Sequence, residues 1–305
     1  MTESYLLLDI GGTFIKFGAA SLDGELLHGI SGSVPVDSLG SAREVTGAFA
    51  EAVRSGTEAL GKNDRMLAGI GICIPGPFDY GKGIPLMKHK FLSIYGMSLK
   101  DFFRSLPQTG PDMPVGFIHD VNAALLGEMS RGNAAGYPDS ALVTLGTGLG
   151  FAFSRAGRIM VNEKGSPLCP IYSIPYRDGI LEDYVSKRGF LKAYREISGK
   201  SADPSLTVAD IGAMAAEGDP AALETFLSVG EILASALKPK LVENRIGCLL
   251  LGGQISRSFR FMERALKAGL SGVSCLKTVM PAKNIGEAAF YGIVEEMKNN
   301  CVVLV

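Results

Sequence analysis

A carboxylate, two glycines and a threonine stand close together near the start of the chain, in DIGGT (residues 9–13). The apolar run before them predicts a strand that delivers Asp9 into a tight turn. Gly11 and Gly12 would let backbone N–H groups face outward, which suits phosphate oxygens, and the hydroxyl of Thr13 adds a donor. The segment therefore predicts a phosphate-binding turn.

The charged residues of this segment suggest a metal as well as phosphate. Asp9 would repel phosphate directly, so we expect it to hold Mg²⁺ through water. Lys16 lies on the returning strand and could reach a phosphate. The alternative is an ordinary hairpin with a glycine-rich turn and an aspartate that has its own partners.

A second glycine-rich loop follows another apolar run, in LGTGLG (residues 145–150). Gly146, Thr147 and Gly148 make another phosphate-sized concavity after a strand. The loop lacks the GK[ST] of a Walker motif, and a strand rather than a helix follows it, so it is no dinucleotide fingerprint. The loop alone is a weak signal, and it indicates phosphate binding mainly because the first glycine turn occurs in the same chain.

A third segment, HDVNAA (residues 119–124), places an acid between a strand and a helix. Asp120 would stand at the carboxyl end of the strand, the edge where open α/β sheets bind ligands. A carboxylate there can accept the proton of a hydroxyl that attacks a phosphoryl group. The alternative is that Asp120 caps the helix and that His119 is structural.

The fourth segment is LLLGGQIS (residues 249–256), in which a buried strand runs into Gly252 and Gly253. Two glycines allow a flat group such as adenine or ribose to approach the backbone closely. A plain turn from strand to helix explains the same residues.

The elements that must position these segments follow a repeated pattern. Leu6–Ala20 and Leu142–Ser154 each read as a strand, a glycine-containing loop and a returning strand, which indicates an internal duplication. A helix is expected at 42–60, buried strands at 67–74, 115–118 and 248–251, helices at 207–216 and 221–237, and a last helix at about 286–298. Strands that are apolar on both faces predict an α/β fold with helices over the sheets.

Composition limits the class of protein. The chain has 305 residues, a formal charge of −1 and 20% charged residues, which gives no electrostatic reason to expect nucleic-acid or membrane-surface partners. Its apolar stretches are interrupted before the length of a membrane span, and its N-terminus does not read as a signal peptide. The five scattered cysteines include Cys73, Cys248 and Cys301 and are expected to be buried free thiols, which favours the cytoplasm.

In this order and spacing the four segments resemble the ROK family of sugar kinases, within the group that includes actin, hexokinase and the ATPase domain of heat-shock chaperones. The resemblance implies two RNase H-like domains flanking a cleft, here residues 1–114 and 115–305, with the last helix packing back on the first. It implies that the two glycine-rich loops hold the phosphates and metal of ATP, that Gly252 and Gly253 lie along the adenosine, and that Asp120 is the base. The run GIGICIPGPFDYGKG (residues 69–83) resembles the family's PGP segment, which brings Gly76 to the sugar.

The chain departs from the family around the sugar and at the zinc site. His119 replaces the family's Asn, and the E-x-G-H motif ends in Ser166, although Glu163 remains. In the expected zinc motif the cysteine positions hold other residues and only Gly179 and Glu182 remain, so we expect no structural zinc. Glu163, Glu182, His119 and Asn122 remain candidates for orienting the sugar.

The resulting expectation is a homodimeric kinase that phosphorylates a hexose hydroxyl, usually O6, with ATP and Mg²⁺. Glucose is the default sugar, with an N-acylhexosamine or fructose as alternatives. A catalytically silent sugar sensor of the ROK type is the rival, since the departures near the sugar also fit a lost activity. An actin-like ATPase is disfavoured by Glu163 and Glu182, and a DNA-binding repressor by the absence of a helix-turn-helix segment ahead of residue 9.

Overall fold

The computed structural model describes residues 1–199 and 203–299. Their contacts divide the chain into two compact units. Unit 1 consists of Met1–Ser130, Val161–Leu168 and the described residues from Glu287 onward, and unit 2 of Arg131–Met160 and Cys169–Gly286. Each unit is built around its own five-stranded sheet.

The sheet of unit 1 has the order β3-β2-β1-β4-β7. Its strands are β1 (Thr2–Ile10), β2 (Phe14–Ser21), β3 (Leu26–Pro35), β4 (Arg65–Ile74) and β7 (Val115–His119). The first three strands pair antiparallel, whereas β1, β4 and β7 run parallel to one another. A short hairpin, β5 (Phe78–Asp79) with β6 (Ile84–Pro85), follows β4.

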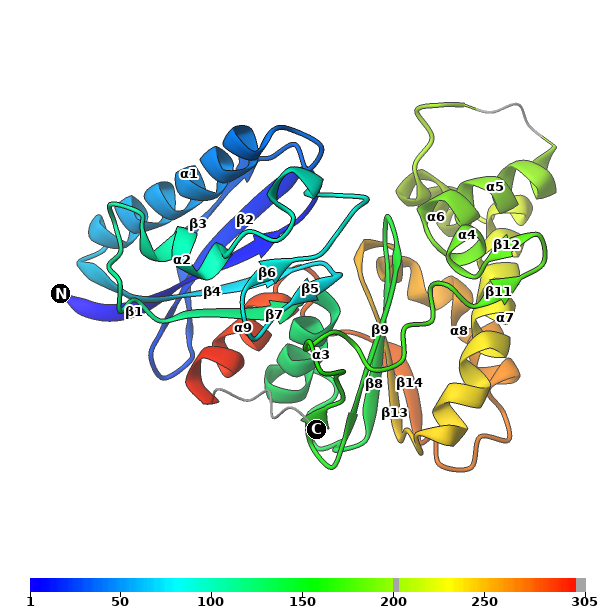
Figure 1. Cartoon of the computed structure of the whole chain (residues 1–305). Coiled ribbons are helices and arrows are strands. Elements are labelled where there is room, and N and C mark those ends of the chain that lie inside the picture. Colours follow the sequence, from blue (N-terminus) through cyan, green and yellow to red (C-terminus); the bar gives the residue numbers. More distant parts are fainter. Residues whose placement is uncertain (200–202, 300–305) are drawn as a thin grey trace. The chain divides into compact units, whose positions relative to one another are not determined.

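Helices cover both faces of this sheet because successive side chains of its central strands point to opposite sides. Leu6 and Leu8 belong to the core shared with α1 (Ala42–Gly61), and Leu7 to the core shared with α9 (Ala288–Asn299). The remaining helical elements of the unit are η1 (Leu92–Ile94), α2 (Leu99–Arg104) and α3 (Asp120–Arg131). Figure 1 shows α1 and α9 along opposite faces of the sheet.

Helices α3 and α9 approach each other closely through two glycines. A Cβ at Gly292 would lie 1.8 Å from the carbonyl oxygen of Ala123, and one at Gly127 would lie 1.9 Å from that of Ala288. Only glycine permits this backbone approach. The helix that begins at Asp120 is therefore fixed against α9.

The domain boundary expected after residue 114 differs from this division. Strand β7 pairs with β4 in parallel, from Ile70 opposite Val115 to Ile74 opposite His119. Because that pairing completes the sheet of unit 1, the polypeptide leaves the unit only near Ser130, and Val161–Leu168 returns to it. The Pro- and Gly-rich segment before Val115 is a loop within the unit rather than a linker.

Unit 2 repeats the same strand order, as β10-β9-β8-β13-β14. The strands are β8 (Ser140–Leu145), β9 (Leu149–Arg155), β10 (Arg158–Ile159), β13 (Cys248–Gly252) and β14 (Thr278–Pro281), and a small hairpin joins β11 (Pro175–Tyr176) to β12 (Gly179–Ile180). In unit 1, β1 pairs antiparallel with β2 and parallel with β4. In unit 2, β8 likewise pairs antiparallel with β9 and parallel with β13. The duplication predicted from the sequence is confirmed.

The helical elements of unit 2 are α4 (Glu182–Val185), α5 (Lys187–Ser198), α6 (Val208–Ala216), α7 (Pro220–Glu243), η2 (Gln254–Ser258) and α8 (Phe259–Gly269). Helices α7 and α8 lie beside the sheet (Figure 1). By length and composition α7 could cross a membrane. However, Phe226, Leu233 and Leu241 on this helix are fully buried in the core of unit 2, so it serves here as a core helix.

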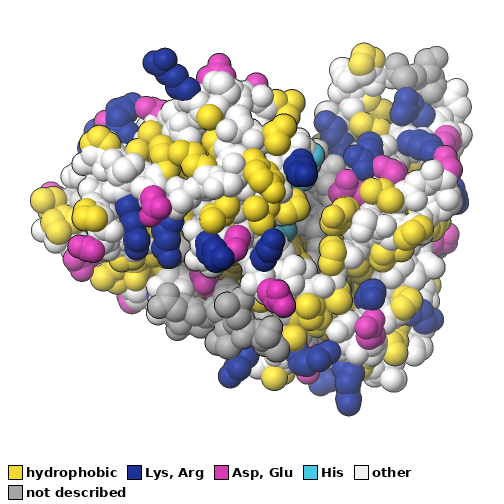
Figure 2. Space-filling view, viewed as in Figure 1, with side chains coloured by type: hydrophobic (Ala, Val, Ile, Leu, Met, Phe, Trp, Pro, Cys, Tyr) yellow, Lys and Arg dark blue, Asp and Glu magenta, His cyan; other side chains and the backbone are white. Residues whose placement is uncertain are grey.

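Two surface expectations can be compared with the structure. Cys73 and Cys248 are buried free thiols as expected, whereas Cys169 and Cys275 are only partly buried and Cys301 lies outside the described residues. On the face drawn in Figure 2, Lys and Arg side chains are interspersed with Asp and Glu. That face has no extended area of one charge that would attract a polyanion.

Candidate active site

Two backbone N–H groups in the turn between β1 and β2 have no partner among the described residues. The N–H of Gly11 donates to Phe14 O at 2.9 Å, and the carbonyl of Gly12 accepts from the N–H of Ser38 at 3.1 Å. Within residues 1–199 and 203–299, the N–H groups of Gly12 and Thr13 make no hydrogen bond. Two outward N–H groups in a glycine turn fit a phosphate group, so the residues present suit the nucleotide that the sequence suggests.

Asp9 sits beside this turn, opposite Lys16 in the β1–β2 pairing. Burial raises the pKa of Asp9, and the nearby charge of Asp120 raises it further, while the Cys73 thiol and the charge of Lys16 lower it. The Cys73 Sγ donates to Oδ1 of Asp9 at 3.2 Å. A carboxylate destabilised by burial and by a second acid favours a nearby cation, which suits the expected role of Asp9 toward Mg²⁺.

Asp120 is the first residue of α3 and follows directly on β7. Its Oδ1 accepts the N–H of the adjacent Val121 at 2.7 Å and lies 2.7 Å from Nδ1 of His119. A capping aspartate would instead bind an N–H two or three residues further on. Asp120 therefore differs from an ordinary N-cap in position, although its carboxylate does satisfy the Val121 N–H at the start of α3.

Polar neighbours keep Asp120 ionised. Burial raises its pKa, but the charge of His119, hydrogen bonds from His119 and Val121, and the charge of Lys90 together outweigh that effect, so the pKa is lowered. Its side chain remains 49% exposed, so incoming groups can reach the carboxylate. An ionised, oriented and accessible carboxylate can act as a general base.

His119 and Gly76, both predicted to contact substrate, lie side by side. A Cβ at Gly76 would lie 3.4 Å from Cδ2 of His119 and 3.4 Å from the hydroxyl of Tyr80. The rings of Tyr80 and His119 are 5.8 Å apart between centroids, and the Tyr80 hydroxyl donates to Ile74 O at 2.9 Å. Tyr80 therefore supports one side of the His119 ring.

Asn122 faces the segment Val161–Leu168, which also carries Glu163. Its Nδ2 donates to Gly165 O at 3.1 Å, while its Oδ1 is buried and has no hydrogen-bond partner among the described residues. Tyr80 binds the same segment by donating its N–H to Lys164 O at 2.9 Å. Glu163 is exposed in that segment. Unit 1 thus gathers Gly76, His119, Asp120 and Asn122 around one location, with Glu163 on the segment that closes it.

The loop of unit 2 resembles the turn of unit 1 in its free donors. The N–H of Gly146 donates to Gly148 O at 3.1 Å, and the carbonyl of Gly146 accepts from Lys187 N–H at 2.8 Å. In the part of the chain that the structure describes, the N–H groups of Thr147 and Gly148 have no partner, and both residues are exposed. This loop is a second place where phosphate oxygens fit.

Glu182 binds this loop with both carboxylate oxygens occupied. Oε2 accepts the N–H of Leu149 at 2.9 Å, and Oε1 accepts from Nη2 of Arg188 at 3.0 Å. A Cβ at Gly148 would lie 2.9 Å from Oε2, so a larger residue there would have to displace the Glu182 carboxylate. Glu182 thus braces the glycine-rich loop, a role that the sequence did not suggest.

Gly252 and Gly253 join the end of β13 to the same loop. Gly252 pairs with Thr144 of β8, and Gly253 has φ +80°, with a Cβ there lying 2.3 Å from Leu145 O. Both the positive φ and the close approach require glycine. These contacts explain Gly253 structurally, and the expected contact of both glycines with adenosine stays a prediction.

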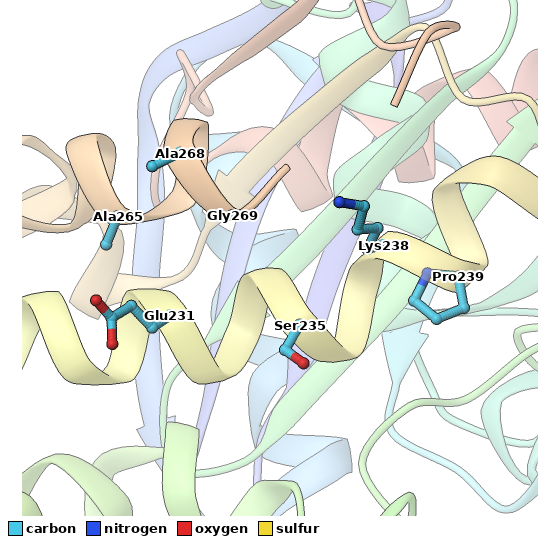
Figure 3. Close-up of a pocket in the computed structure, with 7 residues that line it drawn as sticks. All are labelled: Glu231, Ser235, Lys238, Pro239, Ala265, Ala268 and Gly269. Carbon is cyan, nitrogen blue, oxygen red and sulfur yellow. The ribbon is translucent and has the colours of Figure 1, made fainter. Parts of the chain in front are cut away.

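A surface pocket of unit 2 lies between α7 and α8, lined by Glu231, Ser235, Lys238, Pro239, Ala265, Ala268 and Gly269. Figure 3 shows that Ala265, Ala268 and Gly269 come from α8, and that Glu231 and Lys238 extend from α7 on the side of α8. The ammonium of Lys238 is already bound to Ser271 O at 3.1 Å. The pocket contains none of the predicted site residues.

Two further observations concern metal-binding clusters and the side chains near the site. The described residues include no cluster of three or more His, Cys, Asp or Glu that could hold a metal ion. Lys90, Tyr80 and Cys73 lie at the site, although none of the three was predicted individually as a site residue. The basic run KHK (residues 88–90) beside the PGP segment was the available signal for Lys90.

Comparison with known proteins identifies the family. Residues 5–168 match the sequence model of the ROK family, which is more than half of the chain. The chain belongs to the ROK family. The resemblance inferred from the four segments is confirmed.

The relatives of this ROK protein are sugar kinases by name. It is 27% identical over 203 residues to a glucokinase of Halalkalibacterium halodurans, a match that covers 63% of this chain and 59% of that protein. It is 31% identical over 144 residues to a beta-glucoside kinase of Klebsiella pneumoniae, covering 47% of this chain and 43% of that protein. The matched part thus spans only about half of these relatives' length.

Solved structures share the fold of this ROK protein. A ROK family glucokinase from Streptomyces griseus, in complex with glucose and AMPPNP, matches with a TM-score of 0.79 at 20% identity, over 96% of this chain and 98% of that one. A ROK family transcriptional regulator homologous to the MLC protein of E. coli matches with a TM-score of 0.84 at 17% identity, over 98% and 79%. The predicted fold class, α/β with the actin-like arrangement in each unit, is confirmed.

Proposed function

We propose that this protein transfers the γ-phosphoryl group of ATP to a hydroxyl of a hexose, with O6 of a glucose-like sugar as the first expectation. The observation that carries the proposal is Asp120, an ionised carboxylate held by His119 and by the Val121 N–H at the start of α3. The named activities of the relatives supply the class of substrate.

The nucleotide would be held by backbone donors. The unpaired N–H groups of Gly12 and Thr13 suit phosphate oxygens, with Lys16 nearby, and those of Thr147 and Gly148 form a second candidate site in unit 2. Asp9 is the residue that would hold Mg²⁺, which when bound neutralises charge on the phosphates. Gly252 and Gly253 are the residues expected to lie along the adenosine.

The sugar would lie where Asp120 can accept the proton of its attacking hydroxyl. The buried, unpartnered Oδ1 of Asn122 would accept a hydrogen bond from another hydroxyl, since an orphaned acceptor is costly unless a ligand satisfies it. His119 supplies a ring beside Gly76, and Glu163 and Glu182 remain candidate acceptors. An N-acylhexosamine or fructose is the alternative substrate, since His119 and Ser166 alter the family's usual contacts.

The test is MgATP turnover by the purified protein against a panel of hexoses, hexosamines and N-acylhexosamines, with ADP and sugar phosphate measured together. We expect one sugar to give both products in equal amounts. Asp120→Asn should then lower kcat by about 10²- to 10⁴-fold, as loss of a general base does, while the sugar Kd changes little. Asp112→Asn, at an exposed carboxylate of unit 1, is the matched control and should leave kcat unchanged.

A sugar sensor without kinase activity is the second candidate, because a ROK family transcriptional regulator shares the fold. It would bind one sugar of the panel in calorimetry and form no sugar phosphate. That result, or near-normal turnover by Asp120→Asn, would overturn the proposed mechanism.

A further inference from the structure

Lys90 is held beside the phosphate-binding turn of unit 1 by its neighbours. Phe91, the next residue, is fully buried and has φ +52°, a backbone conformation that a non-glycine residue adopts only at a cost. Its N–H donates to Ser38 O at 2.6 Å, and the N–H of Ser38 donates to Gly12 O at 3.1 Å. Two hydrogen bonds in series therefore tie the backbone at Lys90 to the turn.

The side chain of Lys90 passes over the same turn. A Cβ at Gly12 would lie 3.6 Å from Cε and 3.7 Å from Cδ of Lys90. Lys90 is half-buried, whereas the preceding residues Lys88 and His89 are exposed. Within the described ranges, the ammonium of Lys90 makes no hydrogen bond or ion pair. Its charge nevertheless reaches Asp120, where it helps to lower the pKa of that carboxyl.

We propose that Lys90 binds the phosphoryl group while it passes from the nucleotide to the acceptor hydroxyl. The inference rests on the proposed kinase function and adds a catalytic residue to it. Lys90 lies between the turn with free N–H groups, which would hold the donor phosphates, and the carboxylate that would receive the acceptor's proton. The transferred group must occupy the space between those two.

Charge balance supports this assignment. Asp9 and Asp120 are close enough that the charge of Asp120 raises the pKa of Asp9, and the transferred group brings further negative charge on its oxygens. Lys16 is placed to offset Asp9 and His119 pairs with Asp120, which leaves Lys90 as a further cation near Asp120 that has no hydrogen-bonded partner among the described residues. A fixed cation at the point where charge accumulates stabilises the transition state without reorganising.

The alternative is a lysine that covers Gly12 with its methylene groups and keeps its charge in water. Lys90→Met separates the two roles, because methionine keeps an unbranched apolar stem over Gly12 and removes the charge. Lys90→Arg keeps the charge, and Lys88→Met is the matched control at an exposed lysine two residues away. Should Lys90→Met fail to fold, Lys90→Gln serves as the second variant.

With the sugar identified by the panel, we expect Lys90→Met to lower kcat by about 10²- to 10³-fold, the usual loss for one preorganised donor. The sugar Kd should change less than threefold, Lys90→Arg should recover at least a tenth of wild-type kcat, and Lys88→Met should match wild type. A kcat for Lys90→Met within threefold of wild type would overturn the proposal. So would a rise in the sugar Kd at unchanged kcat, which would mean that Lys90 contacts the acceptor instead.

If the wild-type protein phosphorylates no sugar, the kinase proposal fails. The role of Lys90 toward the phosphoryl group is then tested by nucleotide binding. The ratio of MgATP to MgADP affinity isolates contacts to the γ-phosphoryl group. Calorimetry should show that ratio falling at least fivefold in Lys90→Met and not in Lys88→Met. An unchanged ratio in that case would remove the role given to Lys90.

Discussion

Replacement of Glu182 distinguishes between two roles for a residue that the sequence assigns to the sugar. Both carboxylate oxygens of Glu182 accept hydrogen bonds within unit 2, from the N–H of Leu149 at 2.9 Å and from Arg188 at 3.0 Å. If bracing the glycine-rich loop is its main role, its loss should weaken nucleotide binding. If it binds the sugar, its loss should weaken sugar binding.

The expected cost follows from the two contacts. A hydrogen bond from a backbone N–H to a charged carboxylate contributes about 1.5–3 kcal/mol, and the side chain of Glu182 is only 21% exposed. The pair with Arg188, whose side chain is 54% exposed, adds about 0–1 kcal/mol. Glu182→Ala should therefore cost about 2 kcal/mol at the loop, which corresponds to about a 30-fold loss in kcat/KM for ATP.

The assay compares kcat/KM for MgATP and for the sugar in Glu182→Ala and Glu182→Gln. Glutamine keeps an oxygen that can accept from Leu149, so we expect Glu182→Gln to lose less than fivefold for ATP. Glu263→Ala, which removes an exposed carboxylate paired with Lys267 on α8, is the control and should change neither constant. A loss confined to the sugar, with ATP unaffected, would refute the bracing role.

The remaining predictions concern stability and pH. Gly292→Ala places a Cβ 1.8 Å from the carbonyl oxygen of Ala123, so chemical denaturation should show a fall of about 3 kcal/mol or more in the free energy of unfolding. Gly47→Ala, on the exposed side of α1 with no atom within 4 Å, should instead raise that free energy by about 0.5–1 kcal/mol. Equal effects of the two substitutions would contradict the packing argument. Because the pKa of Asp120 is lowered, its charge and the activity that needs it should persist below the ordinary aspartate range and be lost only as the pH falls through the lowered value. His119→Asn removes the largest lowering influence and leaves burial to raise the pKa, so the acid limb of kcat/KM should move to higher pH; a limb that stays in place would exclude His119 as the cause.

The repeated fold could be predicted because its signals are local. Apolar runs of strand length that end in glycine loops appear twice in the sequence, and β1–β2 and β8–β9 follow them. The helix α8 (Phe259–Gly269) was missed, although its buried residues Phe259, Met262 and Leu266 have helical spacing. The boundary predicted after residue 114 differs from the division by contacts, because the pairing of β7 with β4 is a long-range contact that no local pattern reveals.

The residues of the candidate site also divide into those with a local sequence pattern and those that depend on tertiary contacts. Asp9, Asp120 and the glycine loops carry recognisable local patterns, so the sequence could locate them. Lys90 and Tyr80 reach the site only through tertiary contacts, with Gly12 and with His119. The bracing role of Glu182 depends on a contact with Leu149, 33 residues away in the chain, and the sequence alone could assign it only by family resemblance.

The common strand order allows equivalent positions of the two units to be compared, and the charged residues of the proposed site all lie in unit 1. The next-to-last residue of β1 is Asp9, which lies opposite Cys73 of the parallel strand β4. The next-to-last residue of β8 is Thr144, which lies opposite Gly252 of β13. At equivalent places one unit thus carries a carboxylate with a thiol donor, and the other a neutral hydroxyl residue beside a glycine.

The fifth strands of the two sheets differ in the same way. Strand β7 ends at His119 and leads directly to Asp120, whereas β14 ends at Pro281 and leads to Ala282. The duplicated frame therefore keeps two loops with free N–H groups but places Asp9, Lys16, Lys90 and Asp120 all in unit 1. In the proposed kinase reaction, neutral donors would suffice wherever phosphates are held, and charged groups would be needed only where the phosphoryl group and proton move; the distribution of these residues between the units agrees with that proposal.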